Sequence, residues 1–585
     1  MQKRQPFFNF SLYVLIDEFD FTWRDLVAIM MFISSLWLGI NLIRDMDVPY
    51  STTTFQNLDL SYSRIPYYMM RSTFRMFLAY GASLLFTTTI GYWAYRSKRA
   101  RAFIIPIVDI LQSVPVLGFL SITVTGFMSF FPHNLLGVEL ASLFAIFTGQ
   151  VWNMTLGFYH SLITLPNDLK EVSRVYKLNP WQRFTRLELP NSTISLVWNS
   201  MMSFGGGWFF VVQSEMITVL GKNIKLPGIG SYMGMALEKG DSRAALYAVL
   251  AMVTTIVLID LLFWKPITVW SMKFKNEQVD SSENPKSLIF EILNKSKLVN
   301  RIVNFIMSSI DTFFNWFFNL GAVVFYKNNR KTRVTKNNKI LDFVFYLLVI
   351  ILIFYVTWFA FSEIKNKISF PDILLVLKLG TYTMLRVFLM VIVSTVIWTP
   401  IGVWVGFRPN AARIVRPMAQ IGASFPINMT FPIVVGFFIS HNVDMNWGSI
   451  FLLSLGAQWY VLFNIIAGAS SIPGDMKECA RIFKLKGIKL WSKMIIPAIF
   501  PYWVTGACTA AGGAWNASIV AEYASFGKQK LIAQGLGSYI SQATSDGNWN
   551  GIFLSIVTMS VFVVFINRFV WRNLYKLSAE KFHLE

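Results

Sequence analysis

The sequence PNDLKEVSRVYKLNPWQRFTRLELP at residues 166–190 is repeated, in altered form, as PGDMKECARIFKLKGIKLWSKMIIP at residues 473–497. The two segments align without a gap, so that Glu171 of the first corresponds to Glu478 of the second. Both are basic, and both lie between long apolar runs. Polar loops of this length are uncommon as simple connections. We therefore expect these segments, named here the first and second duplicated loops, to organise two related halves of the chain.

Each duplicated loop should form a helix, a turn and a second short helix. Asp168 and Asp475 can cap the first helix, with a glutamate three residues later in the D-x-x-E form of a capping box. This helix should stop near Leu178 and Leu485, because a proline follows in the first copy and Gly487 offers a left-handed stop in the second. The second short helix should end before the proline that closes each loop.

The loops resemble the EAA loop of ABC importer permeases, whose pattern is roughly E-A-A-x-x-x-G-A followed further on by I-x-L-P. The matching residues are Glu171, Leu189, Pro190, Glu478, Ala480, Ile496 and Pro497. Lys177 and Lys484 stand where the family has glycine, so we expect the turn to be displaced to 179–180 and 486–487. A basic loop that only satisfies the positive-inside rule is the alternative, but that rule requires no repeated Asp, Glu and Pro frame.

The resemblance implies that both loops face the cytoplasm and each bind one of two separate ABC ATPase subunits. The residues expected at these contacts are Asp168, Glu171, Arg174, Lys177, Trp181, Asp475, Glu478, Arg481, Lys484 and Gly487. The sequence contains no G-x-x-x-x-G-K-[ST] phosphate loop. We therefore expect no enzymatic activity and no cofactor in this chain, with ATP and Mg bound by the partner subunits.

The composition is that of a multi-pass membrane protein. Of the 585 residues, 54% are hydrophobic and 14% are charged, and the mean hydropathy is +0.50. The net charge of +21 falls mainly in loops between apolar runs, where it reports topology rather than nucleic-acid binding. The two cysteines predict no disulfide framework, and the four histidines lack the spacing of a metal site. We expect an all-α membrane protein of the bacterial cytoplasmic (inner) membrane, in contact with lipid.

Residue pairs at a constant separation indicate a fused tandem duplication. They include Arg75 with Arg386, Pro115 with Pro426, Gly206 with Gly513, Trp208 with Trp515, and Glu215 with Glu522. About twelve transmembrane helices should therefore form two homologous six-helix halves, as in type I ABC importers. We place the first permease repeat at 1–270, a basic cytoplasmic linker at 271–339 and the second repeat at 340–585, with its first span at about 341–361. The third span should be kinked or discontinuous, because it contains Pro115.

The linker contains one amphipathic segment. Its polar residues, spaced three or four apart, are Asn304, Ser308, Asp311, Asn315 and Asn319. A further span here would place the two loops on opposite sides of the membrane, so we predict a helix lying on the cytoplasmic leaflet. A helix packed against another chain is the alternative.

A second repeated motif follows each loop, as FGGGWFFVVQSEM at 204–216 and AGGAWNASIVAEY at 511–523. It is similar to a Trp-rich segment ending in Ala-Glu in permeases of the nitrate, sulfonate, taurine and bicarbonate class. The resemblance places Gly206, Trp208, Glu215, Gly513, Trp515 and Glu522 along the translocation pathway. Alternatively, the two glutamates pair with arginine or backbone amides and serve stability, since a carboxylate in the membrane is costly without a partner.

Four further polar residues are candidates for the pathway. Arg75 and Arg386 could attract an anion from outside, although such arginines often extend to the lipid headgroups instead. Gln150 and Gln458 lie in apolar spans, where small polar groups also join helices together.

The best interpretation is the membrane-spanning permease of an ATP-driven ABC importer for a small solute. The resemblance implies an anion such as nitrate, sulfonate or bicarbonate, normally delivered by an extracytoplasmic substrate-binding protein. An ion-gradient-driven secondary transporter would also explain apolar spans and internal duplication. It would not explain two similar polar loops on the same face.

Overall fold

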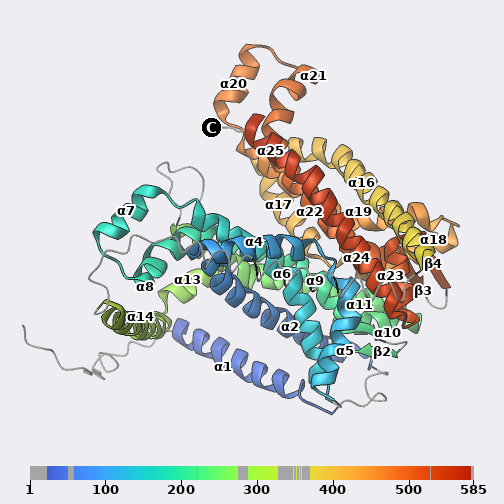
Figure 1. Ribbon diagram of the computed structural model, residues 1–585, viewed down its shortest axis with the longest axis horizontal. Coiled ribbons are helices and arrows are strands. Elements are labelled where there is room, and N and C mark those ends of the chain that lie inside the picture. Colours follow the sequence, from blue (N-terminus) through green and yellow to red (C-terminus); the bar gives the residue numbers. More distant parts are fainter. Residues whose placement is uncertain are drawn as a thin grey trace, which may run out of the picture.

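The computed structural model describes residues 23–49, 58–132, 134–219, 222–274, 287–326, 369–526 and 529–581, together with the single positions 347, 351, 355 and 358. Most of these residues are helical (Figure 1). Six helical segments in this part of the chain are long and apolar enough to cross a membrane: Trp23–Arg44, Ser242–Phe274, Phe370–Gly406, Met445–Ser471, Gly487–Ala521 and Trp549–Lys581. The span expected at about 341–361 lies outside the described residues, apart from those single positions.

The two halves contain similar elements in the same order, with two differences: the second half has no described equivalent of the first helix, and it has one long helix where the first half has both Ile65–Phe86 and Tyr92–Arg96. In the first half these are α1 (Trp23–Arg44), α2 (Ile65–Phe86), α3 (Tyr92–Arg96), α4 (Lys98–Ser113), α5 (Leu120–Phe130), α6 (Leu136–Ile163), α9 (Leu189–Glu215), β1 (Met216–Val219), β2 (Lys222–Lys225), α10 (Ile229–Glu238), α11 (Ser242–Ile259) and α12 (Lys265–Ser271). In the second half they are α16 (Phe370–Gly406), α17 (Pro409–Ser424), α18 (Phe431–Ser440), α19 (Met445–Ser471), α22 (Ile496–Ala521), β3 (Tyr523–Phe526), β4 (Gln529–Ile532), α23 (Leu536–Ser545), α24 (Trp549–Ile566) and α25 (Arg572–Lys581). The strands form one antiparallel hairpin in each half.

A proline breaks the same helix in both halves. In the first half α4 and α5 are separated at Pro115, and Val114 is extended with ψ 126°. In the second half α17 and α18 are separated at Pro426, and Phe425 is extended with ψ 128°. A residue before proline avoids the helical region, which explains both breaks. The predicted discontinuity of the third span is confirmed.

The two halves share one apolar core. Its main cluster includes buried Trp208 of the first half and buried Trp515 of the second. A polar contact also joins the halves, since the backbone N–H of Val116 donates to Asn516 Oδ1 over 2.8 Å. The core therefore continues across the junction between the repeats.

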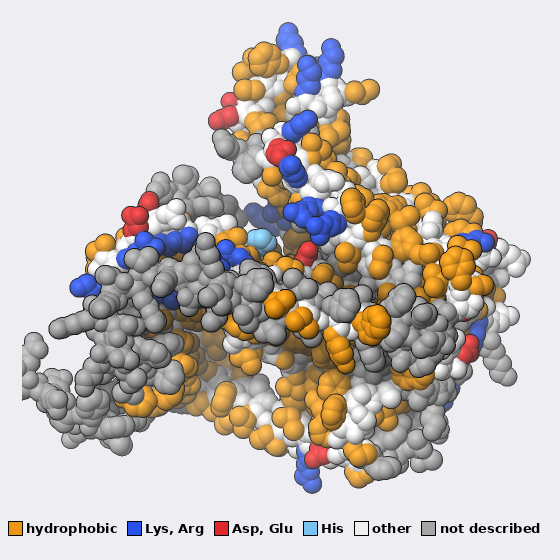
Figure 2. Space-filling model, in the orientation of Figure 1, with side chains coloured by type: hydrophobic (Ala, Val, Ile, Leu, Met, Phe, Trp, Pro, Cys, Tyr) orange, Lys and Arg blue, Asp and Glu red, His pale blue; other side chains and the backbone are white. Residues whose placement is uncertain are grey.

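The duplicated loops project from the ends of the halves that lie away from the β-hairpins (Figure 1). Each consists of two short helices, which are α7 (Asn167–Val175) and α8 (Pro180–Arg183) in the first loop and α20 (Gly474–Ile482) and α21 (Gly487–Leu490) in the second. Lys and Arg side chains gather over the projecting second loop, with hydrophobic side chains between them (Figure 2). Both loops thus lie on the same side of the molecule, at the ends away from the hairpins.

The predicted capping boxes at Asp168 and Asp475 are wrong. The N-cap positions are Pro166 and Pro473, and neither helix has a side-chain cap. The aspartates lie inside the first turn, where a negative charge is still favourable near the positive end of the helix dipole. A capping box forms instead at the second helix of the first loop, between Asn179 and its third residue.

The predicted displacement of the turn is also wrong. Lys177 and Lys484 have φ of 50° and 48°, so the left-handed residue stays where the family has glycine. In the first loop the N–H of Leu178 then bonds the carbonyl of Ser173 over 3.1 Å, which closes a Schellman-type end. The helices consequently end before these lysines and not near Leu178 and Leu485. Gly487 is left-handed as well, with φ 55°, but it begins α21.

The closing prolines, Pro190 and Pro497, do not end a helix. A π-helical turn, Phe184–Glu188 in the first loop and Trp491–Ile495 in the second, joins each short helix to the long helix that follows. Proline in a helix normally collides with the carbonyl four residues before it. The wider π turn, with bonds five residues apart, lies at that carbonyl and relieves the conflict. Each proline therefore lies in the first turn of a continuing helix.

Candidate functional site

Each half contains a buried ion pair where its long first core helix meets the end of the helix that follows the duplicated loop. In the first half, Arg75 Nη1 of α2 lies 2.8 Å from Glu215 Oε1 of α9. In the second half, Arg386 Nη1 of α16 lies 2.9 Å from Glu522 Oε1. Both glutamates are fully buried. The predicted candidates are thus brought together in two equivalent pairs, each inside its own half.

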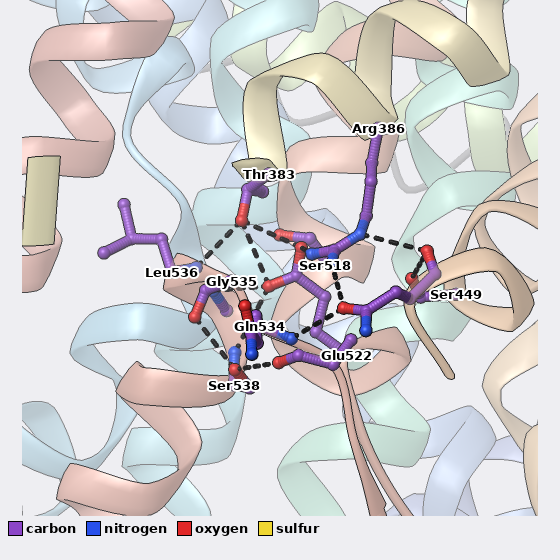
Figure 3. A network of polar contacts seen from close by, with 12 residues as sticks. Thr383, Arg386, Ser449, Ser518, Glu522, Gln534, Gly535, Leu536 and Ser538 are labelled. Carbon is purple, nitrogen blue, oxygen red and sulfur yellow. Dashed lines mark hydrogen bonds and ion pairs between the residues drawn. The ribbon is translucent and has the colours of Figure 1, made fainter. Parts of the chain in front are cut away.

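Each glutamate also accepts hydrogen bonds from further donors that are equivalent in the two halves. Ser72 Oγ donates to Glu215 Oε1 over 2.5 Å, and Thr383 Oγ1 donates to Glu522 Oε1 over 2.8 Å. Backbone N–H groups at the start of α10 and α23 donate to the second oxygen of each glutamate, over 2.7 and 2.8 Å. Figure 3 shows Thr383, Arg386 and the α23 residues converging on Glu522. Such saturation is what a buried carboxylate needs, because each unpaired oxygen would be costly.

Glycines create the space for these carboxylates. A Cβ on Gly228 would overlap the carboxylate of Glu215, and one on Gly535 would overlap that of Glu522. A Cβ on Gly230 would lie 2.5 Å from the backbone oxygen of Val212. Gly228 and Gly535 were not among the residues predicted from the sequence. The repeated G-x-G-S-Y motif at 228–232 and 535–539 is the signal that marks them.

The first network holds one more arginine and one more glutamate than the second. Glu139 of α6 lies 2.6 Å from Arg71 and 2.5 Å from Arg75. At the equivalent positions the second half has Tyr382 and Asn446, and Asn446 Oδ1 accepts from Arg386 Nη2 over 2.7 Å. The second half thus lacks both the charge of Arg71 and the charge of Glu139, so each network is electrically neutral. Neutrality is essential here, because an uncompensated charge inside a membrane domain is strongly unfavourable.

A cavity of about 350 Å³ lies between the two halves near the hairpins. Its polar lining residues include Gln213, Glu238, Asn428, Tyr523, Ser541 and Thr544. Asn428 Nδ2 donates to Gln213 Oε1 over 3.2 Å and so links the halves at this cavity. The lining contains no Lys or Arg within the described chain, and Glu238 pairs with Lys225 of β2 over 2.5 Å.

None of the ten predicted pathway residues lines this cavity. Gly206 and Gly513 both face Tyr460. A Cβ on Gly206 would lie 3.5 Å from the Tyr460 hydroxyl, and one on Gly513 would lie 3.9 Å from the Tyr460 ring. Gln150 donates to the sulfur of Met76, and Gln458 accepts from the indole of Trp398. Trp208 lines a small separate pocket of about 20 Å³, and Trp515 is buried in the core. The buried ion pairs match the stabilising alternative given for Glu215 and Glu522. Arg75 and Arg386 are themselves buried in these pairs, which does not match the alternative that they extend to the lipid headgroups. A place on the pathway stays a prediction for all ten residues.

The residues predicted to contact partners in the duplicated loops lie on the surface, except for Trp181, which is half-buried. Beside them each loop exposes an apolar pair that was not among the residues predicted from the sequence. It consists of Val175 and Tyr176 in the first loop, 77% and 75% exposed, and Ile482 and Phe483 in the second, 75% and 76% exposed. Their equivalent positions in the two loops are the signal that could have identified them.

Comparison with known proteins places these features in a family. The family described as "Binding-protein-dependent transport system inner membrane component" matches residues 84–263 and 398–576. The nitrate import permease protein NrtB of Leptolyngbya laminosa is 26% identical over 170 residues, covering 29% of this chain and 57% of the relative. The bicarbonate transport system permease protein CmpB of Synechococcus elongatus is 26% identical over 178 residues, covering 30% and 61%.

A third relative, named as the putative aliphatic sulfonates transport permease protein SsuC of Bacillus subtilis, is 26% identical over 185 residues, covering 30% of this chain and 63% of the relative. The chain thus spans less than two thirds of the length of each of these relatives. Family membership and the apolar helices identify a multi-pass protein of the inner membrane. With two matches that together cover more than half of its length, the chain belongs to the inner membrane components of binding-protein-dependent transport systems, and it carries the family's domain twice.

Proposed function

We propose that this chain supplies both membrane-spanning halves of an ATP-driven importer, with one ATPase subunit bound at each duplicated loop. The observation that carries the proposal is the repeated apolar pair at the tip of each loop. A pair of large apolar side chains that is three-quarters exposed at equivalent places in two loops fits a protein-binding surface. The basic residues around it would set the orientation of an acidic partner surface.

The solute pathway is proposed to run between the halves, through the cavity beside Gln213 and Asn428. Its volume of about 350 Å³ suits a small solute. The relatives are named for nitrate, bicarbonate and aliphatic sulfonates, so a small anion is the solute class that we propose. An extracytoplasmic binding protein, as the family description implies, would deliver it to the hairpin side.

Co-purification tests the proposed docking. Changing Tyr176→Asp and Phe483→Asp together should abolish recovery of the ATPase subunits with the full-length chain, because a charge would replace the apolar centre of each contact. Tyr62→Asp is the matched control: Tyr62 is 77% exposed but lies before α2, at the hairpin end, and should leave recovery unchanged. Solute uptake that persists without any ATPase would contradict the proposal and favour a gradient-driven transporter.

A further inference from the structure

The linker between the halves forms two helices, α13 (Leu288–Lys295) and α14 (Lys297–Tyr326). The start of α14 is held by α1. Asp25, whose side chain is buried, accepts from Ser296 Oγ over 2.6 Å and from the N–H of Leu298 over 2.9 Å. These bonds satisfy donors that a helix start leaves unpaired. The first end of α14 is thereby attached to the first membrane span.

The middle of α14 binds the first duplicated loop. Trp181 Nε1 donates to Asp311 Oδ1 over 2.8 Å, and the Trp181 ring stacks on Phe314 with centroids 4.2 Å apart. Asn179 Nδ2 donates to Asn315 Oδ1 over 2.8 Å. Two residues of the polar stripe, Asp311 and Asn315, therefore contact the loop and are partly buried by it.

The side of α14 opposite this stripe is apolar and exposed. Ile302, Ile306 and Phe313, which share that side by helical spacing, are 49%, 48% and 57% exposed. In Figure 1, α14 is seen end-on while α1 runs across the view, so α14 lies across the direction of the span. Basic residues flank it, with Lys295 before it and the sequence YKNNRKTRVTKNNK from residue 326 onward.

We propose that α14 binds the anionic surface of the cytoplasmic leaflet and ties the first duplicated loop to it. The exposed apolar side, the crosswise orientation and the flanking cations are what binding to an anionic lipid surface requires. The assignment of this leaflet to the cytoplasm rests on the proposed function. The linker thereby acts as a lipid-bound support for one of the two loops.

The second duplicated loop has no equivalent support within the described chain. Lys486 and Ile488 stand at the positions of Asn179 and Trp181, and Ile488 is 85% exposed. A second contact also favours the first loop: Glu188, fully buried, accepts from the hydroxyl of Tyr92 over 2.9 Å. The two loops therefore differ in their surfaces, and the first loop is held to the rest of the chain by more contacts than the second.

Cross-linking tests the attachment of α14 to the loop. In full-length protein with Cys479→Ser and Cys508→Ser, the pair Asn179→Cys and Asn315→Cys should form a disulfide efficiently in native membranes. The matched pair Lys486→Cys and Asn315→Cys, which uses the equivalent position of the second loop, should not. Equal yields from the two pairs, or none from the first, would overturn the attachment.

A fluorescent label tests the lipid contact. With the label on Ile306→Cys in nanodiscs, a doxyl-labelled lipid should quench it several-fold more strongly than a label on Ser308→Cys. The quenching should increase when phosphatidylglycerol is added to phosphatidylcholine. A label at 306 that aqueous iodide quenches instead, or that neither agent reaches because a protein covers it, would refute lipid binding. No ATPase is needed in either test, so their failure is distinguishable from failure of the proposed function.

Discussion

At the scale of single residues, the two glutamates at the ends of α9 and α22 show how a duplicated site can change in sequence while its charges stay balanced. Glu215 and Glu522 keep the same arginine and the same backbone N–H donors. The first half adds the pair Arg71 and Glu139. Because those charges were gained or lost as a pair, both sites remain neutral and neither half is left with an unpaired buried ion.

The extra carboxylate predicts unequal effects of the same substitution. In the Glu522→Gln variant Arg386 loses its one ion-pair partner within the described chain, at a cost of roughly 3–5 kcal/mol. In Glu215→Gln, Arg75 keeps Glu139 at 2.5 Å, so the loss should be clearly smaller. Thermal unfolding of the detergent-solubilised protein measures both. Equal losses of Tm would contradict this account of the two networks.

The left-handed lysines permit a second prediction. A non-glycine residue in this conformation costs about 1–2 kcal/mol, and a β-branched one is far less tolerated. Lys177→Gly should therefore retain or raise the Tm, whereas Lys177→Val should lower it. The same pair of changes at Lys484 should behave alike, because its φ is 48°. A stable Lys177→Val variant would show that the loop reorganises.

At the scale of elements, the π turns connect the duplicated loops to the core. The π turns before Pro190 and Pro497 let the short helices run into the long ones, so continuous helix joins each loop to α9 or α22. A flexible break at the proline would have separated the two. The same separation in sequence relates the π turns Asp260–Trp264 and Asn567–Trp571, so the duplication extends to these helix irregularities.

Removing one aromatic side chain should release α14 from the first loop. Trp181→Ala eliminates the stack on Phe314 and the bond to Asp311, and such an aromatic pair contributes about 0.5–1.5 kcal/mol beyond its buried area. Hydrogen–deuterium exchange within residues 297–326 should then become faster. Ile488→Ala, at the equivalent exposed position, should not change it. Unaltered exchange in Trp181→Ala would mean that α14 is held by other contacts.

At the scale of the whole molecule, the halves enclose a cavity that is lined by different residues at equivalent positions of the two halves. Gln213 faces it from one half and Val520 occupies the equivalent position in the other. Likewise Leu117 corresponds to Asn428. Fusion in one chain permits such differences, because each position can change alone. A solute in this cavity would meet different chemistry on its two sides.

Filling the cavity should block transport. Val520→Trp inserts a large side chain into a space of about 350 Å³ and should reduce uptake of the solute by an order of magnitude or more, without loss of ATPase binding. Leu246→Trp is the control, since Leu246 is exposed on the outside of α11. Radiolabelled nitrate, bicarbonate and sulfonate uptake in proteoliposomes measures the effect. Normal uptake by Val520→Trp would exclude this cavity as the pathway.

The sequence by itself determined the duplication, the helical membrane class, the proline breaks and the surface position of the loops. The duplication follows from residue pairs at a constant separation along the chain. The other features follow from hydropathy and from the restricted backbone before proline, which act over a few residues. Only the tertiary structure decided which polar residues meet. Arg75 and Glu215 are far apart in the chain, Gly228 has a role only because a carboxylate lies against it, and the polar stripe of α14 faces Trp181 because the linker folds back on the first loop. Such contacts depend on long-range packing, which no local pattern encodes.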